Sequence, residues 1–139
     1  RMIAADGEGA TKLIEVAVTG APDRQAARTV AKSVVMSSLV KAAMFGADAN
    51  WGRILCAIGY AEAEFDVSQI EVLLSSPAGR IRVCLHGSGV PFSEEEAKKI
   101  LLETEIRVEI NMHQGTAFAT AWGCDLTYDY VKINGDYRT

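Results

Sequence analysis

The chain has 139 residues, of which 49% are hydrophobic and 23% charged, and its formal net charge is −4. This length and composition predict one folded domain with an ordinary hydrophobic core. A negative charge without a basic stripe argues against a nucleic-acid-binding protein, and no apolar run is long enough to cross a membrane.

The cysteines argue against a disulfide scaffold, because Cys56, Cys84 and Cys124 are few, widely spaced and odd in number. With only His86 and His113 as histidines, and no closely spaced pair of cysteines, we expect no metal site. We expect buried free thiols in a reducing compartment, which means the cytoplasm, or the mitochondrial matrix or a plastid in a eukaryote. The chain begins with arginine rather than methionine and lacks a signal peptide, which suggests a processed or trimmed product.

The first regular element is a predicted strand. Residues 12–21 alternate with period two and include several β-branched side chains. Asp23 then suits the N-cap of a helix over residues 24–36, whose apolar side chains recur at helical spacing. A second helical stretch follows over residues 39–45 and stops at Gly46.

The middle of the chain predicts a short helix and a hairpin. Asp48 or Asn50 can cap the helix, which ends near Gly59. Residues 68–76 and 80–87 both alternate as strands and are joined by a Pro-Ala-Gly turn. We therefore expect these two strands to pair with each other.

The last third predicts a helix, two strands and a final helix. Ser93 begins the first helix in a capping-box arrangement. Residues 104–113 and 116–124 alternate as strands, and the short turn between them predicts a second hairpin. We expect the final helix to be capped by Asp125 and closed at Asn134-Gly135.

These elements predict an α/β (α+β) domain over residues 1–139, with helices layered on a mostly antiparallel sheet. Their order is β-α-(α)-β-β-α-β-β-α. The first six main elements follow the split β-α-β order of a ferredoxin-like half.

The motifs are weak when each is read alone. The segment DGEGATK (6–12) lacks the spacing of a phosphate-binding loop and precedes a strand. We expect Trp51 to be a packing anchor, whereas Arg53 either pairs with a carboxylate or binds an anion. His86 and His113 have no nucleophilic partner nearby in the sequence, so they do not indicate a catalytic dyad.

Four segments are informative together: RMIAADGEGATKLIEV, SLVKAAMFGADANWGRILCAIGYA, GVPFSEEEA and ATAWGCDLTYDYVKINGDYRT. In this order and spacing they resemble the C-terminal part of ornithine acetyltransferase, an enzyme of arginine biosynthesis. The resemblance extends over the whole chain. It implies the two-layer sandwich fold of self-processing acyltransferases with an N-terminal threonine.

The resemblance also implies an activity. Members of the family are made as a precursor that cleaves itself at an Ala-Thr bond into an α and a β chain, which assemble as α2β2. The freed threonine takes the acetyl group from N2-acetylornithine and passes it to glutamate, with no cofactor. Some members also accept acetyl-CoA as the acetyl donor.

The catalytic threonine and the oxyanion hole of the family have no counterpart in this chain. The Ala-Thr pair at Thr11 is followed by Lys12 and lies outside the family's cleavage segment. The chain therefore resembles the β chain without its catalytic start, and we expect it to be inactive alone. The family's substrate-binding positions match Glu8, Asn134 and Thr139, where a carboxylate suits an ammonium group and polar groups suit an amino-acid head.

Two other functions stay open at this point. The first is a non-catalytic, ferredoxin-like module that binds amino acids or a protein partner, which would fit the absence of a nucleophile. The second is a related self-processing aminopeptidase, because hydrolysis and acyl transfer share the same nucleophile.

Overall fold

The computed structural model describes residues 12–124 and 131–135, and of the last five only the backbone. The helices of this part are α2 (Arg24–Val35), α3 (Ser38–Phe45), α4 (Trp51–Gly59), the short 3₁₀ helix η1 (Val67–Gln69) and α5 (Glu94–Leu101). The strands are β1 (Leu13–Ala21), β2 (Glu71–Ser76), β3 (Gly79–Leu85), β4 (Ser88–Gly89), β5 (Glu105–Asn111), β6 (Ala117–Cys124) and β7 (Val131–Gly135).

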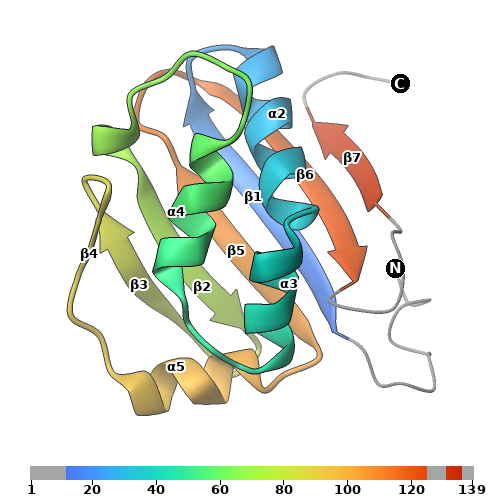
Figure 1. Ribbon diagram of the computed structural model, residues 1–139, viewed down its shortest axis with the longest axis vertical. Helices are drawn as coiled ribbons and strands as arrows, with labels where there is room; N and C mark the ends of the chain where they lie inside the picture. The colour runs from blue at the N-terminus through green and yellow to red at the C-terminus, as the bar shows by residue number, and fades with distance from the viewer. Residues whose placement is uncertain (1–11, 125–130, 136–139) are drawn as a thin grey trace.

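The strands form one seven-stranded sheet in the order β4-β3-β2-β5-β1-β6-β7. Only β1 and β5 run parallel, and the other neighbouring strands are antiparallel. Figure 1 shows α2, α3 and α4 in front of one face of the sheet and α5 across its lower end. The opposite face is not covered by any helix of the described residues. This arrangement confirms the predicted α+β fold with helices layered on a mostly antiparallel sheet.

β1 is an inner strand of the sheet, between β5 and β6, and it buries apolar side chains on both of its faces. Ile14, Val16 and Val18 face the helices and are at most 1% exposed, while Leu13 and Ala17 on the opposite face are 6% and 7% exposed. A strand that buries both faces is typical of the middle of a sheet rather than its edge. The predicted strand over residues 12–21 is therefore confirmed.

The predicted hairpin between residues 104–113 and 116–124 is wrong, because β1 lies between β5 and β6. Val16 is opposite Val108 of β5 on one side and Ala121 of β6 on the other. In this position, the backbone groups on both edges of apolar β1 are paired with a neighbouring strand. The segment that follows β5 instead crosses the end of β1, where the backbone N–H of Gln114 donates to the Gly20 carbonyl at 2.7 Å.

The predicted ferredoxin-like order is also wrong. In a ferredoxin-like sheet, the first strand separates the central hairpin from the strand that follows the second helix. Here β5 separates β1 from the β2–β3 hairpin. The hairpin itself is as predicted, with Ser76 opposite Gly79 at its turn.

The end of the chain holds another correction, because residues 131–135 form strand β7 rather than a helix. Ile133 lies opposite Ala121, so β7 completes the free edge of β6. An unpaired edge offers a row of backbone donors and acceptors, and satisfying it outweighs a weak helical pattern. The predicted N-cap, Asp125, lies outside the described residues.

The predicted helix starts are confirmed by their caps. The Asp23 carboxylate accepts from the Ala26 amide at 2.8 Å, and the Ser93 hydroxyl accepts from the Glu96 amide at 3.1 Å. Asn50, rather than Asp48, caps α4. These side chains satisfy backbone donors that the first helical turn leaves unpaired.

The thiols differ in exposure. None of the three cysteines forms a disulfide, as predicted, and Cys84 and Cys124 are buried. Cys56 is exposed near the end of α4, so the expectation that all three are buried is wrong for this residue.

Gly20 has a backbone conformation and close neighbours that leave no room for a side chain. It has φ +65°, and a side chain there would clash with the Asn111 side chain and the His113 amide. We expect Gly20→Ala to lower the free energy of unfolding by about 2 kcal/mol. In contrast, Gly59→Ala meets open space at the end of α4, and should leave this free energy unchanged or raise it by up to about 1 kcal/mol.

Urea unfolding of both variants followed by circular dichroism compares the two glycines. Equal stability of Gly20→Ala and the wild type would show that the crossing over β1 does not need this conformation.

Candidate functional site

The predicted substrate-binding residues are near the two ends of the sequence. Glu8 and Thr139 are outside the described residues. Asn134 belongs to β7, of which the backbone is described. Of these three residues, the structure therefore places only the backbone of Asn134.

Lys12 fixes the end of the DGEGATK segment to two helices. Its ammonium group donates to the Met44 carbonyl at 2.8 Å and to the Leu101 carbonyl at 2.5 Å. These carbonyls belong to the last turns of α3 and α5, where unpaired carbonyls and the helix dipole favour a cation. Lys12, the residue before β1, is thus anchored to the ends of α3 and α5. No short motif in the sequence indicates these two long-range partners.

The sheet register relates β7 to β1. Asn134 lies opposite Thr120 of β6, and Thr120 lies opposite Ala17 of β1. Asn134 is therefore two strands away from the middle of β1, a separation of about 10 Å. The chain enters β1 at Leu13, opposite Cys124. The segment that contains Glu8 and the segment after β6 consequently join the same end of the sheet.

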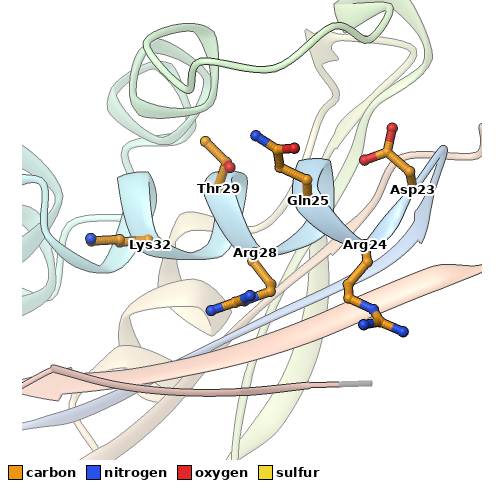
Figure 2. A pocket seen from close by; sticks show the side chains of 6 residues that line it. All are labelled: Asp23, Arg24, Gln25, Arg28, Thr29 and Lys32. Carbon is orange, nitrogen blue, oxygen red and sulfur yellow. The ribbon is translucent and has the colours of Figure 1, made fainter. Parts of the chain in front are cut away.

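A row of cations lies along α2, next to the strands β6 and β7 that this helix contacts. Arg24, Arg28 and Lys32 are spaced four residues apart, which places them on one side of the helix. Figure 2 shows Arg24 and Arg28 pointing the same way from α2, while Gln25 and Thr29 point the other way. The hollow along this helix has a volume of about 810 Å³ and is lined by Asp23, Arg24, Gln25, Arg28, Thr29 and Lys32.

This basic row was missed in the sequence, although its spacing could have indicated it. A line of guanidinium and ammonium groups favours the approach of a carboxylate. The row therefore suits carboxylate groups as partners, whether they belong to the protein itself or to a ligand.

The uncovered face of the sheet carries a network of ion pairs. Arg80 contacts Glu109 at 2.8 Å, and Arg82 contacts Glu71 at 3.2 Å. His113 Nε2 lies 2.8 Å from the second oxygen of Glu71. The carboxylates are the less exposed partners, with side chains 15% exposed for Glu71 and 20% for Glu109.

These contacts shift the pKa of both carboxyl groups. Partial burial raises the pKa of Glu71, but hydrogen bonds from His113 and Arg82 outweigh it and leave the pKa below the ordinary value of 4.5. Partial burial acts in the same direction on Glu109, and its hydrogen bonds from Arg80 and Ser75 likewise bring the pKa below 4.5. Both groups are therefore ionised partners of a fixed polar network at neutral pH, rather than proton donors.

The other two motif residues have structural roles. The Arg53 guanidinium donates to the Leu39 carbonyl at 3.1 Å. The expectation that it pairs with a carboxylate or an anion is therefore replaced by a backbone contact. Trp51 packs closely on Gly89 of β4 and on the hydrophobic core, as expected of an anchor.

Metal sites and membrane-spanning helices are the two remaining kinds of functional feature. Residues 12–124 and 131–135 contain no group of three acidic, histidine or cysteine side chains placed to hold a metal ion. Within the same ranges, none of the helices has the length and apolar character needed to span a bilayer.

The lowered pKa values predict a loss of stability in acid. A carboxylate whose pKa is depressed by folding stabilises the folded state above its unfolded pKa, and this contribution disappears as the pH falls below about 4.5 through the folded value. Glu109→Gln should reduce the free energy of unfolding at pH 7 by about 1 kcal/mol and make its decline between pH 5 and about pH 3 shallower. Glu62→Gln, at an exposed position, serves as the control.

Thermal unfolding across this pH range measures the effect. A parallel decline in Glu109→Gln and the wild type would contradict the role assigned to this network.

Comparison with known proteins identifies the family. The sequence model described as the ArgJ family matches residues 1–139. The chain is 57% identical over 139 residues to "Arginine biosynthesis bifunctional protein ArgJ 1" of Clostridium acetobutylicum, and 56% identical to the ArgJ protein of Caldanaerobacter subterraneus. Both alignments cover 100% of this chain and 34% of the relative, so the chain spans about a third of the curated relatives it matches.

A solved structure gives the same result. The crystal structure of the arginine biosynthesis bifunctional protein ArgJ from Bacillus halodurans superimposes with a TM-score of 0.80 at 52% identity. The match covers 93% of this chain and 59% of that chain. The fold implied by the resemblance is therefore confirmed, and the chain belongs to the ArgJ family.

Proposed function

We propose that residues 1–139 form one domain, the C-terminal portion of the β chain of a bifunctional ornithine acetyltransferase. The whole enzyme transfers the acetyl group of N2-acetylornithine to glutamate, giving ornithine and N-acetylglutamate. The observation that carries this proposal is the ArgJ family match over the full length of the chain. The chain alone is inactive in this account, because the nucleophile lies outside it.

The reaction proceeds through an acetyl ester on that outside threonine. Its hydroxyl oxygen attacks the acetyl carbonyl carbon, the amide C–N bond breaks, and the ornithine nitrogen leaves with a proton. The amine of glutamate then attacks the ester, and the threonine oxygen regains its proton. Hydrogen-bond donors of an oxyanion hole, also outside this chain, stabilise both tetrahedral intermediates.

The coverage of the two kinds of relative supports a precursor that is cut in two. The chain covers 34% of the curated relatives but 59% of the solved chain, so the solved chain is markedly shorter than those proteins. A precursor that separates into an α and a β chain would give such a difference.

In this account Glu8 pairs with the side-chain ammonium group of N2-acetylornithine, while Asn134 and Thr139 bind its amino-acid head. Glu8 is five residues before Leu13, and an extended segment of that length reaches about 17 Å. Asn134 is two strands across and four residues along from Leu13, a separation of about 16 Å, which is close to the full extent of that reach.

Other features of the enzyme follow as proposals. We propose that acetyl-CoA is an alternative acetyl donor, that no cofactor is needed, and that two αβ units assemble as α2β2. A cytoplasmic location agrees with the bacterial sources of the relatives; in a eukaryote it would be the mitochondrial matrix or a plastid. We propose no nucleic-acid or membrane partner.

Glu8→Gln in the full-length enzyme tests the substrate role. Removing a charged hydrogen bond costs about 1.5–3 kcal/mol, so kcat/KM for N2-acetylornithine should fall by roughly 10- to 100-fold. Glu94→Gln, at an exposed position on α5, should leave kcat/KM unchanged. Steady-state assays of N-acetylglutamate formation compare the two variants. An unchanged kcat/KM in Glu8→Gln would remove Glu8 from the site.

The same assay separates the enzyme from a hydrolase. With N2-acetylornithine and glutamate present, the proposed transferase forms ornithine and N-acetylglutamate in equal amounts. Ornithine and free acetate without N-acetylglutamate would instead indicate the related aminopeptidase chemistry.

A further inference from the structure

An apolar hollow lies where the end of α2, the start of α3 and the end of α4 meet. Its lining includes Met36, Leu39, Cys56 and Tyr60, and its volume is about 410 Å³. Met36, Leu39 and Tyr60 are 47%, 57% and 82% exposed, and they are three of the seven exposed large hydrophobic residues in the described part of the chain. We call this hollow the α2–α4 groove.

Two hydrogen bonds between residues that line the groove join its walls. The Ser33 hydroxyl donates to the Ala57 carbonyl at 2.6 Å and joins α2 to α4. The Arg53 guanidinium donates to the Leu39 carbonyl at 3.1 Å and joins α4 to α3. The exposed side chains therefore extend from three connected helices, and the groove is pre-formed.

The uncovered face of the sheet contrasts with this groove. Its strands carry the ion pairs of Arg80 with Glu109 and Arg82 with Glu71, which satisfy one another and keep their arginines half-exposed. This part of the face, over β2, β3 and β5, is polar and is stable in water. A cluster of exposed apolar side chains is instead typical of a surface that another protein segment covers.

We propose that the part of the longer protein that precedes this chain packs an apolar segment into the α2–α4 groove. This inference rests on the proposed function only in taking the chain as the C-terminal part of an ArgJ protein. The chain spans 34% of the length of its relatives. The larger remaining part of such a protein would pack against residues 1–139. Because every precursor carries both parts, their effective concentration is high and favours this occupant over a second copy.

Photo-crosslinking in the full-length protein identifies the occupant. Leu39→p-benzoylphenylalanine places the probe in the groove, and Glu95→p-benzoylphenylalanine on exposed α5 is the control. After irradiation and digestion, mass spectrometry should find residue 39 joined to a peptide from the preceding part of the same protein, and residue 95 without that link. Crosslinks from residue 39 to a peptide of residues 1–139 in a second copy would overturn the proposal.

The native Cys56 gives a second measurement without altering the groove. In the full-length protein, its alkylation by a water-soluble maleimide, relative to the rate in denaturant, should be at least about tenfold slower than that of a cysteine introduced by Glu95→Cys. Cys84 and Cys124 are buried and report on whether the protein stays folded. Equal relative rates at positions 56 and 95 would show an open groove and overturn the proposal.

Neither measurement depends on catalysis. If the unmodified enzyme fails to transfer acetyl groups while residue 39 crosslinks as expected, the proposed function fails and the docking surface stands. If transfer is normal and the groove is open, the docking surface fails and the proposed function stands.

Discussion

The fold depends on the position of β1 between β5 and β6. Its core side chains, centred on Val16, are covered by the helices, and both of its edges have completed backbone ladders. The parallel ladder to β5 brings in the β2–β3 hairpin, and the antiparallel ladder to β6 brings in β7. Every other strand therefore takes its place in the sheet relative to β1, and Gly20 allows the close approach of the segment after β5, which crosses the end of β1.

The same position organises the candidate site. Lys12, directly before β1, holds the carbonyl ends of α3 and α5, so the segment that contains Glu8 starts from a fixed point. On the other side of β1, β6 and β7 place the backbone of Asn134 two strands away. In the proposed enzyme, residues before β1 and on β7 bind the substrate, and the chemistry is supplied from outside the chain. This division is how a domain without a nucleophile would contribute to the proposed acyltransferase.

Local patterns predicted the local structure well. The alternation in β1, the Asp23 cap of α2 and the β2–β3 hairpin each depend on residues close together in the sequence. The predictions failed where pairing is long-range: residues 104–113 and 116–124 look like a hairpin, yet β1, about a hundred residues earlier, pairs with both. The residues around Asn134 have a weak helical pattern, yet they form a strand that pairs with the edge of β6. For the site, Glu8, Asn134 and Thr139 came from family resemblance, whereas the contacts of Lys12 depend on tertiary packing that no short motif encodes.

The central claim is that this chain binds the substrate while a threonine outside it carries the acetyl group. Incubating the full-length protein with N2-acetylornithine in the absence of glutamate should accumulate the acetyl-enzyme, which proteolysis and mass spectrometry can locate. The account predicts one acetyl group, on a threonine that precedes this chain, and none within residues 1–139. An acetyl group on Thr11 or another residue of this chain, or no acetyl-enzyme at all, would contradict it.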